Sequence, residues 1–196
     1  MGYSVSWLAV NGKTFELVIA ELGLSPTGER EEIPESPIVG ASLPTGWVLI
    51  FYNEREAPFV SGETLQKLSK KCRLIECHVE EHTMFSMSGC YENGDLVWNV
   101  MHESRQGIYH LEIEGSPPEA ARVLADDARK QQEATGGESA GVDYVFDVPI
   151  LLAQNITSFR HDLDIDGAEQ HPFHVLTSGT TSGSGLNRKK WWRWRH

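Results

Sequence analysis

The stretch that decides the fold is residues 73–114, RLIECHVEEHTMFSMSGCYENGDLVWNVMHESRQGIYHLEIE. Residues 73–80 alternate with the period of two that a β-strand requires, and Ile75, Cys77 and Val79 make one face apolar. Asn93-Gly94 lies between two further strand-like segments, and both residues tolerate the positive φ of a type I′ turn. A turn at Gln106-Gly107 then leads into residues 108–114. We therefore expect four consecutive strands paired as an antiparallel meander.

The residues before this stretch predict two more strands and two helices. Residues 3–10 are rich in β-formers, and residues 47–53 form an apolar run of the length of a buried strand. Apolar residues at helical spacing predict a helix over 13–22, and Ser61 is placed to cap another. Residues 24–46 contain four prolines, so we expect mostly loop there, with a short edge strand at 38–43.

Two helices are expected after the meander. Ser116-Pro117-Pro118-Glu119 matches a capping box and predicts a helix to about Ala134. Asp147 is the expected cap of a last helix, which carries apolar residues as far as Phe159. A block of strands followed by helices is typical of an α+β fold, an antiparallel sheet with helices packed on one face.

Charged residues are distributed unevenly along the 196-residue chain. The whole chain has 17 Lys and Arg against 28 Asp and Glu, a formal charge of −11. The last nine residues, RKKWWRWRH, hold five of the positive charges, which leaves −16 on residues 1–187. Residues 177–185 contain only Thr, Ser and Gly. We expect one domain over 1–162, a polar linker over 163–187 and a flexible basic, Trp-rich tail over 188–196.

Composition excludes several classes of protein. No apolar run approaches the roughly 20 residues that a membrane-spanning helix needs. The first ten residues lack the basic start of a signal peptide, and three cysteines without CxxC spacing are typical of reduced thiols. The sequence therefore favours a soluble, cytoplasmic protein without a transmembrane segment.

Two motifs resemble metal sites but lack essential parts. His78-Val79-Glu80-Glu81-His82 matches the H-x-x-E-H pattern of zinc proteases, which needs a helix, whereas in a strand the two histidines would lie about 13 Å apart. Residues 162–167 match the opening of a calcium loop, but its twelfth position is Phe173 instead of a glutamate. We expect no metal and no cofactor.

A polar face of the meander is one candidate site. In simple register His78 and Glu80 would share a face with His110 and Glu112, and Ser86 and Ser88 could join them. Histidines beside carboxylates support acid–base or metal-assisted hydrolysis. The alternative is that this is the solvated face that an antiparallel sheet usually has.

The leading functional hypothesis is a small acidic interaction domain, an inhibitor or immunity-like partner of a basic protein. Opposite charge speeds such association, and the long acidic loop offers its carboxylates at Glu29, Glu31, Glu32 and Glu35. The negative body would repel nucleic acid. The tail interleaves its cations with Trp191, Trp192 and Trp194, a pattern that suits an anionic membrane surface, single-stranded nucleic acid or the protein's own acidic body.

Overall fold

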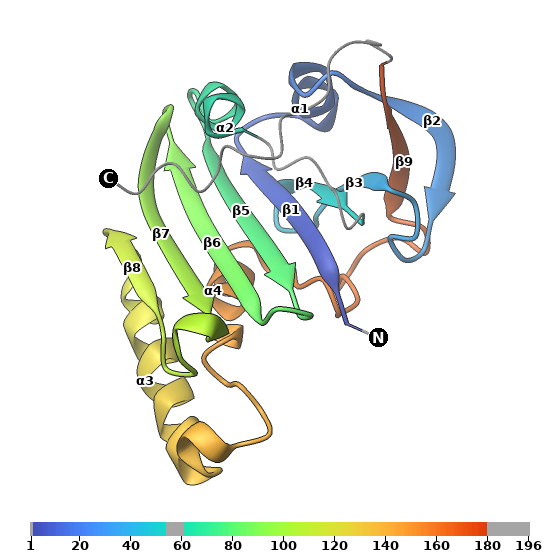
Figure 1. Ribbon diagram of the computed structural model, residues 1–196. Coiled ribbons are helices and arrows are strands. Elements are labelled where there is room, and N and C mark those ends of the chain that lie inside the picture. The colour runs from blue at the N-terminus through green and yellow to red at the C-terminus, as the bar shows by residue number, and fades with distance from the viewer. Residues whose placement is uncertain (1, 54–60, 180–196) are drawn as a thin grey trace.

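The computed structural model describes residues 2–53 and 61–179 (Figure 1). Within them the chain forms one antiparallel sheet in the order β2-β9-β3-β4-β1-β5-β6-β7-β8. The strands are β1 (Ser4–Asn11), β2 (Leu24–Glu31), β3 (Ile38–Ser42), β4 (Trp47–Tyr52), β5 (Arg73–Glu80), β6 (Phe85–Glu92), β7 (Asp95–Glu103), β8 (Glu112–Gly115) and β9 (Phe173–Ser178). The helices are α1 (Phe15–Glu21), α2 (Gly62–Leu68), α3 (Glu119–Ala134) and α4 (Asp147–Thr157). The expected α+β class is confirmed.

The four-strand meander is also confirmed, because β5 to β8 are neighbours in chain order. Asn93 (φ 54°) and Gly94 (φ 99°) form the β6–β7 turn, both with the left-handed backbone that a type I′ turn requires. β8 begins at Glu112, later than expected, because residues 104–106 form a 3-10 turn and the His110 N–H bonds back to Gly107. This compact connection leaves only a short edge strand.

Helices cover both faces of the sheet. α3 and α4 pack on one face, over a core that includes Trp7, Ile75 and Val100, whereas the sequence predicted helices on one face only. α1 and α2 cover one end of the other face, where Leu8 and Ile50 lie in a second core (Figure 1). β1, β4 and β5 lie between the two layers, which explains their continuous burial.

The region predicted as loop and linker contains two strands. Residues 24–31 form β2, and residues 173–178, which we expected to lie in the linker, form β9. β9 pairs with both β2 and β3 and so completes one end of the sheet. Most of β2 is exposed, so its sequence has no apolar alternation, and its pairing depends on a segment far along the chain.

Two helix caps differ from the prediction. Pro118 precedes α3 without any side-chain cap, so the expected capping box of Ser116 does not form. Asp147 is the first residue of α4 and not its cap; Asp143, four residues earlier, accepts a hydrogen bond from the Phe146 N–H instead. α4 ends at Thr157, because Ser158 is left-handed (φ 64°), and Phe159 therefore lies beyond the helix.

Candidate functional site

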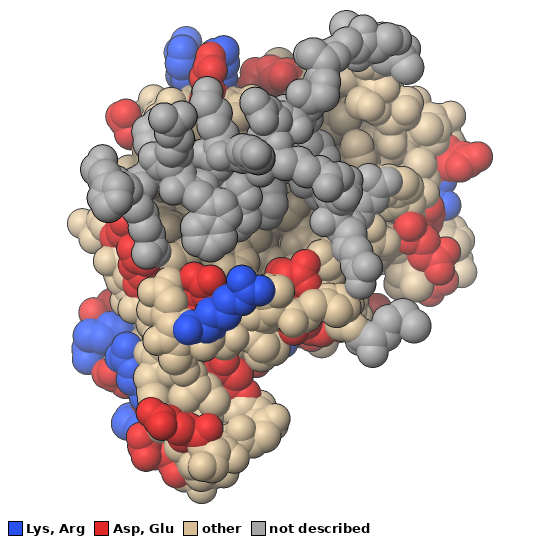
Figure 2. Space-filling model, in the orientation of Figure 1, with Lys and Arg blue, Asp and Glu red and all other residues tan. Residues whose placement is uncertain are grey.

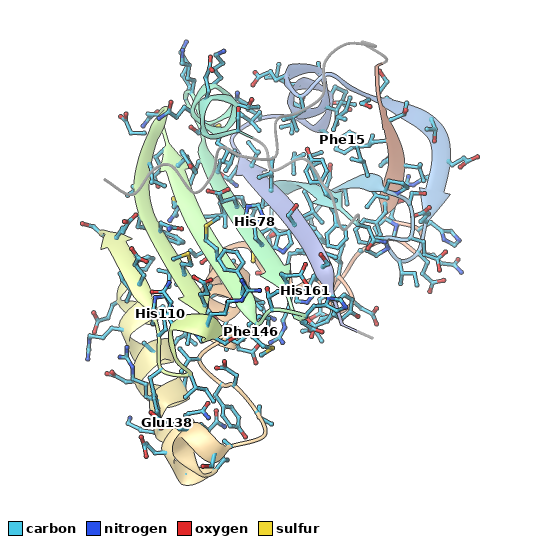
Figure 3. All side chains as sticks on the ribbon, in the orientation of Figure 1. Phe15, His78, His110, Glu138, Phe146 and His161 are labelled. Carbon is cyan, nitrogen blue, oxygen red and sulfur yellow. The ribbon has the colours of Figure 1, made fainter. Side chains whose placement is uncertain are left out.

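Three residues of the proposed catalytic set, His78, Glu80 and Glu112, share a sheet face but do not converge, and His110 lies in the connection before β8. His78 lies opposite Met87, Met87 opposite Met101, and Met101 opposite Glu112, so one row crosses four strands. Three strand spacings separate His78 from Glu112 by about 14 Å. Figure 3 shows His78 and His110 at separate places on the sheet. That distance is too long for shared acid–base work or a common metal ion.

Glu80 and His110 are engaged in local structure. Glu80 accepts hydrogen bonds from the Ser4 hydroxyl at 2.5 Å and from the His82 N–H at 3.1 Å, at the end of β5. Burial by itself would raise the pKa of Glu80, but the hydrogen bonds from Ser4 and His82 outweigh it and lower the pKa. The Nδ1 atom of His110 accepts from the Glu103 N–H at 3.0 Å.

The two serines expected beside His78 lie on the opposite face of the sheet. Ser86 and Ser88 alternate with Met87, and the Ser86 hydroxyl donates to the Phe146 carbonyl of the α4 layer at 2.6 Å. In the described ranges 2–53 and 61–179, no three His, Cys, Asp or Glu side chains are close enough together to hold a metal ion. Within the described residues, the side chains of the proposed catalytic set therefore do not gather at one point of the sheet.

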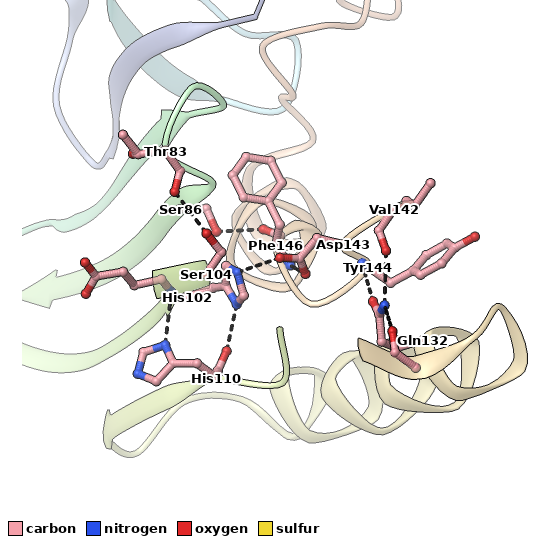
Figure 4. Close-up of polar contacts among 12 residues, drawn as sticks. Thr83, Ser86, His102, Ser104, His110, Gln132, Val142, Asp143, Tyr144 and Phe146 are labelled. Carbon is pink, nitrogen blue, oxygen red and sulfur yellow. Dashed lines mark hydrogen bonds and ion pairs between the residues drawn. The ribbon is translucent and has the colours of Figure 1, made fainter. Parts of the chain in front are cut away.

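A buried histidine–aspartate pair beneath α4 has a structural role (Figure 4). The Nδ1 atom of His102 lies 2.7 Å from the His110 carbonyl, and its Nε2 atom lies 3.0 Å from Asp143 Oδ2. The Nε2 contact is an ion pair whose angle departs from that of a hydrogen bond. Both ring nitrogens face acceptors and the ring is fully buried, so neither is available to a substrate. The pair joins β7 to the start of α4.

A second feature of the α4 layer is a pocket of about 370 Å³. It lies where the connection between α4 and β9 passes the start of β1 and the end of β4. This volume lies in the range of roughly 300–1,000 Å³ that is usual for ligand pockets. Four carboxylates and several apolar side chains surround it. The lining residues used below are Tyr3, Glu32, Phe51, Phe159, His161, Asp162, Asp164 and Glu169.

Aromatic rings form the apolar part of the pocket. Phe159 packs edge-to-face against Trp7 (centroids 5.3 Å apart) and Phe51 (6.2 Å), and all three are buried. Ser158 makes this possible, since its left-handed backbone ends α4 and turns Phe159 back into the core. Tyr3 is 45% exposed and contacts the His161 ring edge-to-face at 4.8 Å. The pocket thus has a rigid aromatic base and one accessible aromatic ring.

The loop after β2 forms one wall and is held from both ends. Glu31 accepts hydrogen bonds from the Glu35 N–H, the Ser36 N–H and the Ser36 hydroxyl. Burial opposes ionisation of Glu31, but these hydrogen bonds outweigh it and lower its pKa. From the other side, the Asn53 amide donates to the Pro34 carbonyl at 2.8 Å. Glu31 is therefore a loop anchor, although we expected it to be a binding residue.

The α4–β9 connection forms the second wall. Arg160 donates to Asp162 at 2.7 Å and lies 3.5 Å from Asp147. Arg30 of β2 lies 3.2 Å from Glu169, which joins the two walls. Burial raises the pKa of Asp147; Arg160 lowers it, while the nearby carboxylates of Asp162, Glu81 and Asp143 raise it further. Negative charge is therefore concentrated beyond what the two arginines neutralise.

His161 contributes an unsatisfied polar atom at the pocket. Its side chain is only 2% exposed, and its Nδ1 atom has no hydrogen-bond partner among the described residues. The nearest carboxylate oxygen, Asp162 Oδ1, is 4.0 Å away, too far for a hydrogen bond. Burial lowers the pKa of His161, so the imidazole is neutral near pH 7. A buried polar atom without a partner has a free-energy cost that a suitable ligand would relieve.

The predicted binding residues are only partly placed at this pocket. Glu32 lines it, Glu29 and Glu35 are exposed and do not line it, and Glu31 is used within the loop. Trp191, Trp192 and Trp194 lie outside the described residues. Figure 2 shows carboxylates gathered over the end of β2, at the right of the view. The sequence analysis considered Asp164 only as part of an incomplete calcium loop and assigned no site to Glu169 or His161, because an acidic run after a helix is typical of a solvated linker.

Comparisons with protein-family models, with curated proteins and with solved structures find no match to this chain. No helix in the part of the chain that the structure describes is long and apolar enough to cross a membrane.

Proposed function

We propose that this chain is an acidic interaction domain that binds a basic protein partner at the pocket between the β2–β3 loop and the α4–β9 connection. The observation that carries the proposal is the convergence of two acidic segments. Residues 29–35 and 160–169 contain eight Asp and Glu against two Arg, and both segments contribute residues to the lining of the same pocket. Such a concentration of like charge favours an oppositely charged ligand.

Internal bonding does not account for this charge. Arg30 and Arg160 pair with Glu169 and Asp162, and Glu31 is held by Ser36. Glu32 and Asp164 have no hydrogen-bond or ion-pair partner among the described residues, yet both line the pocket. Carboxylates without an internal partner are available to cations of another protein. This supports binding of a basic surface, with the rate gain that electrostatic attraction provides.

A polycation titration tests the proposal. The full chain is titrated into fluorescein-labelled hexalysine at 20 and 150 mM NaCl, with fluorescence anisotropy as the measurement. One double variant, Glu32→Gln with Asp164→Asn, removes two pocket charges. The matched control, Asp127→Asn with Glu138→Gln, removes two exposed charges from the α3 end of the molecule. If each pocket carboxylate contributes roughly 0.5 kcal/mol, the pocket variant binds about fivefold more weakly.

The control variant should bind hexalysine within about a factor of two of the unmodified chain. Equal weakening by both variants would show that binding follows net charge alone and would refute the pocket as the site. Absence of binding at 20 mM NaCl would refute the proposed function altogether, because screening is weak at that ionic strength.

A further inference from the structure

We propose that the pocket receives a single arginine side chain of the partner, with its guanidinium between the carboxylates and His161 Nδ1 and its stem against the aromatic rings. This inference rests on the proposed function and names the chemistry that the site recognises. It is carried by the coincidence, in one pocket, of unpaired carboxylates, an unsatisfied buried acceptor and an accessible aromatic ring.

The polar groups match the donors of a guanidinium. Arginine presents five N–H donors in a planar fork and accepts none, so it suits a site made of acceptors. Glu32 and Asp164 supply carboxylate oxygens. His161 is neutral near pH 7, and in the tautomer protonated at Nε2 its Nδ1 atom is an acceptor. Among the described residues, Glu32 and Asp164 have no hydrogen-bond or ion-pair partner, and His161 Nδ1, 4.0 Å from Asp162 Oδ1, takes part in no hydrogen bond, so no internal hydrogen bond must be given up.

The apolar groups favour arginine over lysine. Tyr3 offers an exposed ring at the pocket, and planar guanidinium groups stack on aromatic faces more readily than compact, strongly hydrated ammonium groups do. The buried rings of Phe51 and Phe159 provide an apolar floor for the methylene stem. A lysine ammonium group would also pair with the negative charge, but it would leave some of the acceptors in the pocket without a hydrogen bond.

Small amides of single amino acids separate this inference from general polycation binding. The ¹⁵N-labelled full chain is titrated with N-acetyl-arginine amide, and amide shifts are followed by NMR. N-acetyl-citrulline amide has nearly the same shape without charge, and N-acetyl-lysine amide has the charge without the planar fork. We expect saturable shifts for the arginine compound, centred on residues 159–169 and 32–35, at least tenfold weaker binding of the lysine compound, and none of the citrulline compound.

Variants of His161 test the acceptor. His161→Leu should weaken binding of N-acetyl-arginine amide about tenfold, because one hydrogen bond to a charged donor is lost. His161→Gln retains an acceptor and should recover much of the affinity. The Glu32→Gln and Asp164→Asn pair, which alters no buried group, provides the same test should His161→Leu fail to fold, and it should weaken binding about fivefold.

Any one of several results would overturn the inference. They are equal binding of the citrulline or lysine compound, shifts centred outside the pocket, and unchanged affinity in the acceptor and carboxylate variants. Binding of hexalysine without binding of N-acetyl-arginine amide would leave the proposed function standing and remove only the arginine receptor. Absence of both interactions would remove both proposals.

Discussion

Loss of the Asp143 carboxylate should destabilise the fold by several kcal/mol. Asp143 Oδ2 lies 3.0 Å from His102 Nε2, and Oδ1 accepts the Phe146 N–H at 3.2 Å. The His102 side chain is fully buried and the Asp143 side chain is 8% exposed. Asp143→Ala therefore removes the carboxylate that faces the buried His102 ring and the hydrogen bond that fixes the Phe146 N–H before α4.

The expected magnitude follows from this burial. Breaking a buried pair by removing one partner typically costs about 3–5 kcal/mol, a large part of the roughly 5–15 kcal/mol that holds a domain folded. Asp143→Asn keeps an oxygen for the Phe146 N–H and should lose about half as much. Urea unfolding at pH 7, followed by far-UV circular dichroism, measures both. With a slope of about 2 kcal/mol per molar urea, the Ala variant should shift the midpoint by about 2 M.

Asp127→Ala is the matched control, because Asp127 is 67% exposed on α3 and, within the described part of the chain, pairs only with Lys130. It should change the unfolding free energy by less than about 0.5 kcal/mol. A loss below about 1 kcal/mol for Asp143→Ala would refute the reasoning. It would mean that His102 finds another acceptor, such as water, and that the pair does not hold α4 against β7.

Three further predictions concern other groups. Burial lowers the pKa of His161, so as the pH falls the unfolded chain binds a proton at this histidine before the folded chain does. The folded state should therefore lose stability below about pH 6.5. Between pH 7.5 and 5.5 the melting temperature of His161→Gln should fall less than that of the unmodified chain. Burial also raises the pKa of all three thiols, and Cys77 and Cys90 are enclosed, so Ellman's reagent should label half-buried Cys72 first and the others only on unfolding. A chain ending at Gly185 lacks the five tail cations, so it should bind hexalysine more tightly at 20 mM NaCl; unchanged affinity would show that the tail does not compete for the acidic body.

The strands that could be predicted are those whose own residues show a hydrophobic pattern, either an alternation or a continuous apolar run. β5 alternates and β4 is continuously apolar, so both are visible without knowledge of their neighbours. β2 and β9 escaped prediction for opposite reasons. β2 is exposed along most of its length, and β9 follows an acidic, Gly-containing segment that is typical of a linker. Each is a strand because the other is there to pair with it, and pairing between residues about 150 positions apart leaves no local signal.

The candidate site depends on the same long-range pairing. The alternation of β5 and β8 correctly placed His78 and Glu112 on one face, but their separation depends on the two strands between them. Conversely, Glu32 and Asp164 are 132 positions apart in sequence, and they meet at one pocket because β9 closes the sheet against β2. The distribution of charge in the sequence indicated the acidic β2–β3 loop, which forms one wall of the pocket. It did not indicate the second wall, the α4–β9 connection, or the role of His161.

Repulsion among the clustered pocket carboxylates should destabilise the fold, and this destabilisation distinguishes a binding site from a surface that only keeps the protein soluble. Carboxylates that only kept the protein soluble could lie anywhere on the surface, and a wider spacing would reduce their mutual repulsion. Here four of them line one pocket. Beside it, burial raises the pKa of Asp147, Arg160 lowers it, and the carboxylates of Asp162 and Glu81 raise it further. The Glu32→Gln and Asp164→Asn variant should therefore raise the melting temperature at low salt while it weakens hexalysine binding. Opposite signs for stability and binding are the pattern of residues kept for function; a variant that lost both would indicate that these carboxylates support the fold.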